Sequence, residues 1–298
     1  MKRQTLITDD AITIVAAAQT DIGRCRATNM DAVVVNDAQG LYAVTDGMGG
    51  VSKGAEAAAF VAQELPHLVD QFAMKGMMPT CAGLLLAQIV ANISGTLYER
   101  TQALCSDESN LNTGYGATLC AAWFIEDTAV FANLGDSRAY ILRKGARKMS
   151  QITRDHNWAA DLVELGLLAA IKAKNHPTAR ALRRYCGMMP PAIPDVFIEK
   201  IALGDKILIC SDGLYGMLPD TAITRILRAA PTPAAACAGL IAAANEAGGQ
   251  DNIATVVANV VSPPKKTRKR LHNRAAVDTA LLSTFQHADL AIMQQRSL

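Results

Sequence analysis

Aspartates that follow apolar segments are the residues in this sequence best suited to carry chemistry. One such segment is LYAVTDGMGG, which ends in Asp46 and a glycine-rich turn, and a second is KILICSDG, which ends in Asp212. Asp136 and Asp251 follow looser versions of the same pattern. A single Asp-Gly pair usually marks only a turn. Four repetitions instead indicate one shared site for a hard divalent cation, which prefers several oxygen ligands.

Other common hydrolase chemistries lack their motifs here. The sequence has no G-x-x-x-x-G-K-[ST] phosphate loop and no H-E-x-x-H zinc motif, and no cysteine is followed six residues later by arginine. The seven cysteines are scattered and form no C-x-x-C pair, which argues against structural zinc and a disulfide framework. These absences favour oxygen-ligated metal chemistry in a reducing cytoplasm.

Composition predicts a globular body with a basic tail. Half of the 298 residues are hydrophobic, so a large core is available. No window holds the roughly 18 consecutive apolar residues that a membrane span needs, so we expect no membrane span. The net charge is +2, yet residues 262–298 alone hold seven Lys and Arg against two Asp. We therefore expect one domain over residues 1–261 and a basic linker over 262–298, and we expect no nucleic-acid partner.

The tail permits two interpretations. After PPKKTRKR, one face of an expected amphipathic helix would carry Val277, Leu281, Phe285, Ala288 and Ile292. Such a helix could dock on the body of the same chain. It could instead contact a partner or an acidic surface.

Periodicity predicts an α+β arrangement in which strands are grouped and helices come in pairs. Alanine-rich residues 54–71 predict a helix with a kink or break at Pro66, and residues 79–104 predict a second long helix. The three short runs between Gly116 and Gly145 predict an antiparallel meander. Further strands are expected at 12–18, 32–36, 41–45, 197–203, 206–210 and 253–261, and further helices near 158–166 and at 219–229 and 233–247.

Seven segments between residues 20 and 260 carry the recognisable pattern of this sequence: DIGRCRATNMDA, LYAVTDGMGG, GATLCAA, ANLGDSRAY, ITRDHN, GDKILICSDGL and GGQDNIATVVA. Taken together, they resemble the metal-dependent Ser/Thr protein phosphatases of the PP2C (PPM) family in their bacterial form, and they follow the family's order. The resemblance implies a four-layer α-β-β-α sandwich of two antiparallel sheets flanked by helices.

The resemblance also implies a role for individual residues. Asp46 would bridge two Mn²⁺ or Mg²⁺ ions, with the carbonyl of Gly47 on the second ion. Arg26 would bind the substrate phosphate, for which its fixed fork is suited. Asp31 would hydrogen-bond a metal-bound water. The remaining implied metal ligands are Asp212 and Asp251 on the first ion, and Asp136, with Asp212, on a third.

The implied reaction is attack by a metal-activated water on a phosphoserine or phosphothreonine of a protein, reversing a Ser/Thr kinase. One position departs from the family pattern: Met30 stands where a Glu usually assists the second metal. Methionine offers a soft sulfur that Mn²⁺ and Mg²⁺ do not prefer. Two alternatives stay open. Met30 and the basic tail would also suit a weak or inactive pseudophosphatase that binds phosphoproteins as a regulator. If the resemblance is misleading, the chain is an unrelated divalent-metal hydrolase of another ester.

Overall fold

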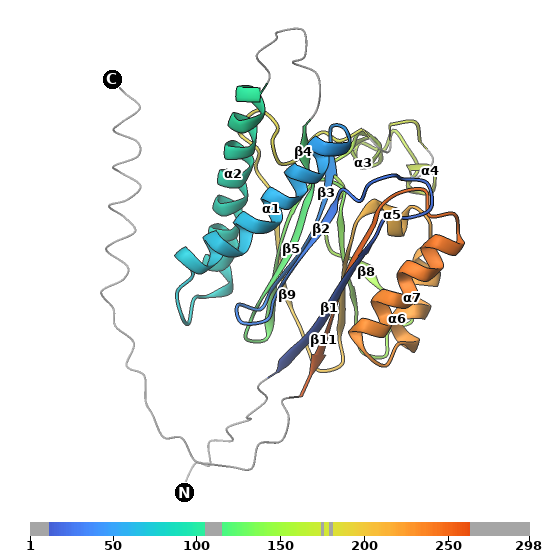
Figure 1. Ribbon diagram of the computed structural model, residues 1–298. Coiled ribbons are helices and arrows are strands. Elements are labelled where there is room, and N and C mark those ends of the chain that lie inside the picture. The colour runs from blue at the N-terminus through green and yellow to red at the C-terminus, as the bar shows by residue number, and fades with distance from the viewer. Residues whose placement is uncertain (1–11, 105–114, 174–175, 179–180, 263–298) are drawn as a thin grey trace, which may run out of the picture. The chain divides into compact units, whose positions relative to one another are not determined.

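The computed structural model describes residues 12–104, 115–173, 176–178 and 181–262. Two antiparallel sheets lie face to face, with one pair of helices outside each sheet (Figure 1). This is the expected α-β-β-α sandwich, so the predicted fold class is confirmed. The helices are α1 (Val51–Phe72), α2 (Pro79–Leu104), α3 (Trp158–Glu164), α4 (Ala170–Ala173), α5 (Asp212–Tyr215), α6 (Asp220–Ala229) and α7 (Pro233–Glu246).

Each sheet joins strands that are distant in sequence. The first sheet has the order β1-β11-β10-β7-β8, the second has the order β2-β3-β5-β6-β9, and β4 pairs with β3. The strands are β1 (Thr13–Asp21), β2 (Asp31–Asn36), β3 (Leu41–Met48), β4 (Gly116–Ala117), β5 (Leu119–Ile125), β6 (Thr128–Leu134), β7 (Arg138–Leu142), β8 (Ser150–Gln151), β9 (Asp195–Lys200), β10 (Lys206–Cys210) and β11 (Ile253–Val261).

Only two of the three strands expected in the meander pair with each other. β5 pairs with β6 over Leu119 to Ile125, but β7 leaves that sheet and pairs with β10 in the other. The chain crosses at Gly135, whose φ of 127° lies in a region that L-residues rarely adopt. The prediction was wrong because strand runs show where strands are, whereas only the backbone of the turn shows which sheet the next strand joins.

The alternation of side chains along each strand builds three hydrophobic layers. In β3, Leu41 and Ala43 pack in the cluster beneath α1 and α2, whereas Tyr42 and Val44 pack between the sheets. In β10, the residues of one face, such as Ile207, lie between the sheets, and those of the other face pack beneath α6 and α7. Both faces of these strands are buried, as the position of each sheet between two apolar layers requires.

α1 and α2 cover the second sheet as long, continuous helices. α1 runs through Pro66 without the predicted break, and Pro66 contributes its carbonyl to a hydrogen bond from the Gln39 amide at 3.2 Å. α2 begins at Pro79 as predicted. By length and composition α2 is apolar enough to cross a membrane, but residues such as Leu86 and Ile93 on one face pack in the core. That packing accounts for its apolar composition.

The predicted boundary near residue 262 falls where the described residues end. Residues Met1–Pro263 form one compact unit of the chain. The amphipathic helix expected within 262–298 lies outside the described residues.

Candidate metal centre

Five carboxylates gather at one end of the sandwich because the strands that carry them end or begin there. β3 contains Asp46 near its end, and Asp212 follows β10 as the first residue of α5. β2 runs the opposite way and begins at Asp31, and β11 begins two residues after Asp251. Asp136 lies in the turn from β6 to β7. The antiparallel pairing therefore brings together residues that are far apart in sequence.

Asp31 and Asp46 face each other across neighbouring strands, as directly paired residues of β2 and β3. Asp31 is 8 % exposed and accepts a hydrogen bond from the hydroxyl of Ser211 at 2.7 Å. Burial, together with the nearby Asp212 and Asp251 carboxylates, raises the pKa of Asp31 to about 7, although the hydrogen bond from Ser211 acts in the opposite direction. Burial and then the charge of Asp31 raise the pKa of Asp46 well above its usual value. Burial and mutual repulsion therefore both disfavour the ionised form of these two carboxyl groups.

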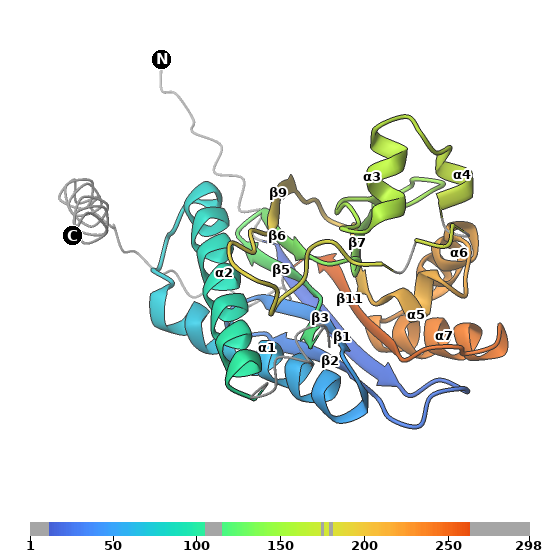
Figure 2. The same cartoon turned by 90° about the horizontal axis from the view of Figure 1, so that it is seen from above.

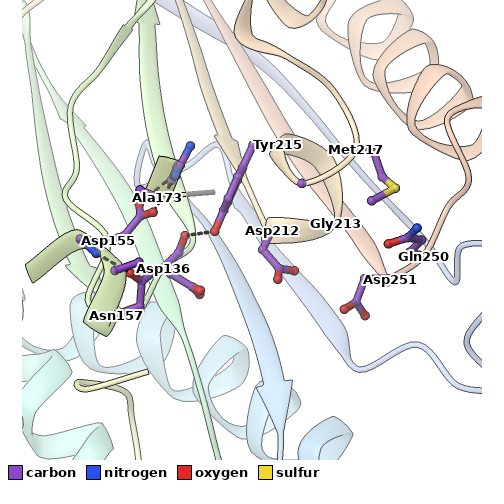
Figure 3. Close-up of a pocket in the computed structure, with 14 residues that line it drawn as sticks. Asp136, Asp155, Asn157, Ala173, Asp212, Gly213, Tyr215, Met217, Gln250 and Asp251 are labelled. Atoms are coloured by element: carbon purple, nitrogen blue, oxygen red, sulfur yellow. Dashed lines mark hydrogen bonds and ion pairs between the residues drawn. The ribbon is translucent and has the colours of Figure 1, made fainter. Parts of the chain in front are cut away.

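Asp136, Asp212 and Asp251 line one pocket of about 230 Å³ (Figure 3). Their labelled side chains come from three different segments and follow one another along its wall. Burial and the charge of Asp212 raise the pKa of Asp136 well above its usual value. Asp212 opens a short helix, α5, that the sequence analysis did not predict and that places Gly213 against the backbone of Asn252.

The ion pair between Arg138 and Asp155 supports the turn that contains Asp136. Arg138 forms two hydrogen bonds with Asp155, at 2.8 and 2.6 Å, and its guanidinium lies 3.7 Å from the ring centre of Tyr215. The hydroxyl of Tyr215 donates to the backbone carbonyl of Asp136 at 2.9 Å. Arg138 thus supports the turn through Tyr215. Sequence reasoning missed Tyr215, because neither its type nor its spacing marks it as part of a site.

His156 holds the other side of the same turn. Its Nδ1 accepts a hydrogen bond from the backbone N–H of Gly135 at 3.1 Å, and its own backbone N–H donates to the Gly135 carbonyl at 2.9 Å. Its Nε2 lies 3.1 Å from a carboxylate oxygen of Asp195, which Arg184 also binds with both terminal nitrogens. Burial lowers the pKa of His156. The neutral ring with its proton on Nε2 satisfies both contacts.

Arg26 contacts the acidic cluster directly. Its guanidinium donates to the outer carboxylate oxygen of Asp251 at 2.7 Å, while the other oxygen of Asp251 accepts from the backbone N–H of Asn252 at 2.9 Å. The Arg26 side chain is 42 % exposed. It lies at the rim of the acidic site, within reach of solvent and of a bound anion.

Asn252 ties the loop that carries Arg26 to the site. Its side-chain oxygen accepts from the backbone N–H of Met30 at 2.9 Å, and its side-chain nitrogen donates to the carbonyls of Ile22 and Thr28 at 2.9 and 3.0 Å. Asn252 is 3 % exposed. A buried amide must find several partners, which the loop backbone supplies. Its place next to Asp251 in GGQDN was the available sequence signal.

Met30 packs against Gly47 and Gly54. The backbone N–H of Gly47 donates to the Met30 carbonyl at 3.1 Å, and a Cβ on Gly47 would lie 2.0 Å from the carbonyl oxygen of Gly54. A Cβ on Gly54 would lie 2.9 Å from the Met30 sulfur. The start of α1 is therefore packed closely on the end of β3. The sulfur fills the space beside this contact.

The donor set fits hard divalent cations in its chemistry. All of the candidate side chains offer carboxylate oxygens, and burial together with their mutual repulsion raises the pKa of Asp31, Asp46 and Asp136. Among the described residues, one buried oxygen of Asp31 has no hydrogen-bond donor. Across these residues, however, no three acidic, histidine or cysteine side chains converge as closely as the ligands of one ion. The carboxylates surround a shared acidic space.

Comparison with known proteins identifies the family of the chain. The sequence profile of the family "Protein phosphatase 2C" matches residues 25–252. The serine/threonine phosphatase stp of Listeria innocua is 34 % identical over 81 % of this chain and 94 % of its own length. Stp1 of Staphylococcus aureus has a similar structure, with a TM-score of 0.73 and 31 % identity over 83 % of this chain and 95 % of that one. The catalytic domain of the phosphatase PstP in complex with two manganese ions has a TM-score of 0.69 and 31 % identity over 84 % of this chain and 100 % of that domain.

Fold and site together define a phosphatase-type sandwich with a cluster of carboxylates at one end. The chain belongs to the protein phosphatase 2C family. The resemblance stated from the motifs is thereby confirmed. None of these relatives favours a phosphoprotein-binding regulator without activity.

Proposed function

We propose that this protein hydrolyses phosphoserine and phosphothreonine in proteins, using divalent metal ions held by the acidic cluster. The observation that carries the proposal is the gathering of five buried or half-buried carboxylates, with Arg26 at their rim, in a chain of the protein phosphatase 2C family. The named relatives are serine/threonine phosphatases, and one of them binds two manganese ions.

The acidic side chains would hold two or three Mn²⁺ or Mg²⁺ ions. Asp46 would bridge two of them, with the Gly47 carbonyl on the second. Asp212 and Asp251 would complete the first, and Asp136 would share a third with Asp212. Ions bound there would supply Lewis acidity toward water and phosphate. Binding would also relieve the repulsion that raises the pKa of Asp46 and Asp136.

Arg26 and Asp31 would act on the reacting groups. Arg26 would turn from Asp251 to the phosphate, since its planar fork can donate to two phosphate oxygens at once. The free oxygen of Asp31 would accept a hydrogen bond from the attacking water, while its other oxygen stays fixed by Ser211. The phosphoryl group would pass directly to water. No side chain needs to act as a nucleophile.

The substrates are then phosphoproteins produced by a Ser/Thr kinase. We infer a cytoplasmic setting from the scattered cysteines, none of which is disulfide-bonded among the described residues. The basic tail would recruit a partner or dock on the body without taking part in the chemistry. Deletion of residues 262–298 should leave turnover of a small aryl phosphate unchanged, and a collapse of turnover would contradict this role.

Phosphate release from matched phosphothreonine, phosphoserine and phosphotyrosine peptides tests the proposal. With Mn²⁺ or Mg²⁺ present, we expect release from the first two peptides and its loss on addition of a chelator. Activity on an aryl phosphate together with inactivity on all phosphopeptides would point to a different ester as substrate. Equal activity with and without chelator would contradict the metal-dependent mechanism.

A further inference from the structure

A second cavity lies beside the catalytic pocket. It measures about 740 Å³ and shares Arg138, Asp155 and Tyr215 with the pocket that contains the acidic cluster. Its other walls come from β8 and the segment after it, from α3 and α4, and from the start of α6 with the two residues before it. α3, α4 and α6 lie on the same side of the molecule in both overall views (Figures 1 and 2). The cavity is therefore reached from the catalytic pocket without crossing the sandwich.

One part of the cavity wall is apolar. Leu218 is buried, Val163 is half-buried, and Pro219 and Ala160 complete the apolar lining there. These side chains leave a surface that a chain of methylene groups could cover. Burying such a chain is favourable by the hydrophobic effect, at about 0.8 kcal/mol for each CH₂ that leaves water.

The charged groups of the cavity leave a negative excess. Arg138 is paired with Asp155, and Arg154 binds both Asp161 and Glu164, so each arginine of the lining already has a carboxylate partner. Within the described residues, by contrast, no hydrogen bond or ion pair engages the carboxylate of Asp220.

The position of Asp220 keeps its charge available. It is exposed and stands in the first turn of α6, where the backbone dipoles of the helix favour a negative charge. Glu164 shares its arginine with Asp161, and its side chain is 60 % exposed. The cavity thus offers an apolar wall together with carboxylates that can accept from a cation.

We propose that this cavity is a substrate subsite that takes a lysine or arginine side chain of the phosphoprotein, a few residues away from the phosphorylated one. The methylene stem would lie on Leu218, Pro219 and Val163, and the cationic head would meet Asp220 with help from Glu164. This inference rests on the proposed function and adds a sequence preference to it. An extended peptide advances about 3.3–3.6 Å per residue, so a cation within four residues of the phosphate can reach a cavity that adjoins the catalytic pocket.

The test is a walk of a single arginine through a phosphothreonine peptide, from four residues before the phosphothreonine to four after it. We expect kcat/KM to rise about three- to fivefold at one or two neighbouring positions, the effect of one partly exposed ion pair, and to rise through KM. Glutamate at the same positions should not raise it. A flat profile, or a preference for glutamate, would overturn the proposal.

Four variants locate the effect. Asp220→Asn should remove the arginine preference, Asp220→Glu should keep it, and Asp220→Lys should convert it to a preference for glutamate. Glu99→Gln, on the exposed face of α2, removes one charge elsewhere and should change nothing. All four should turn over an aryl phosphate like the native chain. A preference that persists in Asp220→Asn, or a loss of turnover on every substrate alike, would contradict the assignment.

A binding measurement that does not depend on turnover tests the subsite independently of the proposed function. The anisotropy of labelled phosphopeptides, measured on the full chain with chelator present, reports affinity even if no peptide is hydrolysed. Tighter binding of the arginine peptide to the native chain than to Asp220→Asn supports the subsite whatever the catalytic result. Equal binding of the arginine and alanine peptides refutes the subsite, even if both are hydrolysed.

Discussion

The imidazole of His156 accepts a hydrogen bond from the backbone N–H of Gly135 at 3.1 Å, and this contact holds the turn that contains Asp136. The ring is buried, and burial lowers its pKa, so that Nδ1 stays an acceptor. Through Asp195 and Arg184 the same ring is joined to the segment that returns from α4 to β9. The acidic centre and that segment therefore share one hydrogen-bonded support.

We predict that His156→Leu destabilises the protein by about 1–3 kcal/mol, the cost of leaving a buried N–H without a partner. His156→Asn, whose side-chain oxygen can replace Nδ1, should recover part of this loss. Urea unfolding of both variants measures the difference. Equal destabilisation of the two would show that the contact with Gly135 is not what His156 contributes.

A second prediction concerns pH. The pKa of Asp31 is about 7 in the folded chain, against an ordinary value of 3.8, so between these values the folded state binds more protons than the unfolded state. The contribution of Asp31 to stability without metal should therefore be fully present below about pH 4 and be lost as pH rises to about 7, by up to about 4 kcal/mol over that range. Asp46 and Asp136 shift in the same direction and add to the fall.

Thermal unfolding with chelator present, recorded from pH 5 to 8, measures this dependence. Asp31→Asn should make the fall shallower and leave the part that Asp46 and Asp136 contribute. Saturating Mn²⁺ should oppose the fall, because a bound cation favours the ionised carboxylates. A melting temperature that rises with pH in the metal-free native chain would contradict the prediction.

Arg26 should matter for substrate more than for folding. Arg26→Ala removes a half-exposed contact with Asp251, so stability should change by less than about 1 kcal/mol. We expect kcat/KM on a phosphothreonine peptide to fall roughly 10- to 100-fold, since charge-assisted phosphate contacts contribute about 1.5–3 kcal/mol. Arg26→Lys keeps the charge but loses the planar guanidinium that can donate to two phosphate oxygens, so its kcat/KM should lie between those of the native chain and Arg26→Ala. Full activity of Arg26→Ala would remove Arg26 from the site.

Met30 offers a test of the second metal position. Its sulfur lies against Gly54, at the contact between β3 and α1, and a thioether is a poor ligand for a hard cation. Met30→Glu should therefore tighten Mn²⁺ binding, read by calorimetry, by about tenfold, as one added carboxylate ligand would. Met30→Gln is the matched control of similar length without charge. An unchanged affinity in Met30→Glu would place the second ion away from residue 30.

The strand ends that carry the acids were predictable because they follow local rules. The apolar run before Asp46 and the one before Asp212 both form strands, and α2 begins at its predicted proline. Regular elements of this kind are set by residue periodicity within one segment.

The supports of the site were not predictable in the same way. Whether β7 pairs with β6 or β10 depends on one turn backbone at Gly135, and the partners of Asn252 and Tyr215 lie far away in sequence. The position of a single polar residue in the sequence does not indicate which distant residues it will contact. The close approach of Gly213 to Asn252 likewise depends on the packing of two distant turns.

The most direct test of the central claim follows metal binding and catalysis in the same samples. Mn²⁺ binding by calorimetry and phosphate release from a phosphothreonine peptide would be measured for the native chain and for Asp212→Asn, with Glu99→Gln as the control. We predict that the native chain and the control bind Mn²⁺ and turn over with the same dependence on metal, whereas Asp212→Asn binds more weakly and loses turnover by a factor of roughly 10² or more. Native turnover that does not depend on Mn²⁺ or Mg²⁺, or that survives in Asp212→Asn, would contradict a metal-dependent phosphatase site built from these carboxylates.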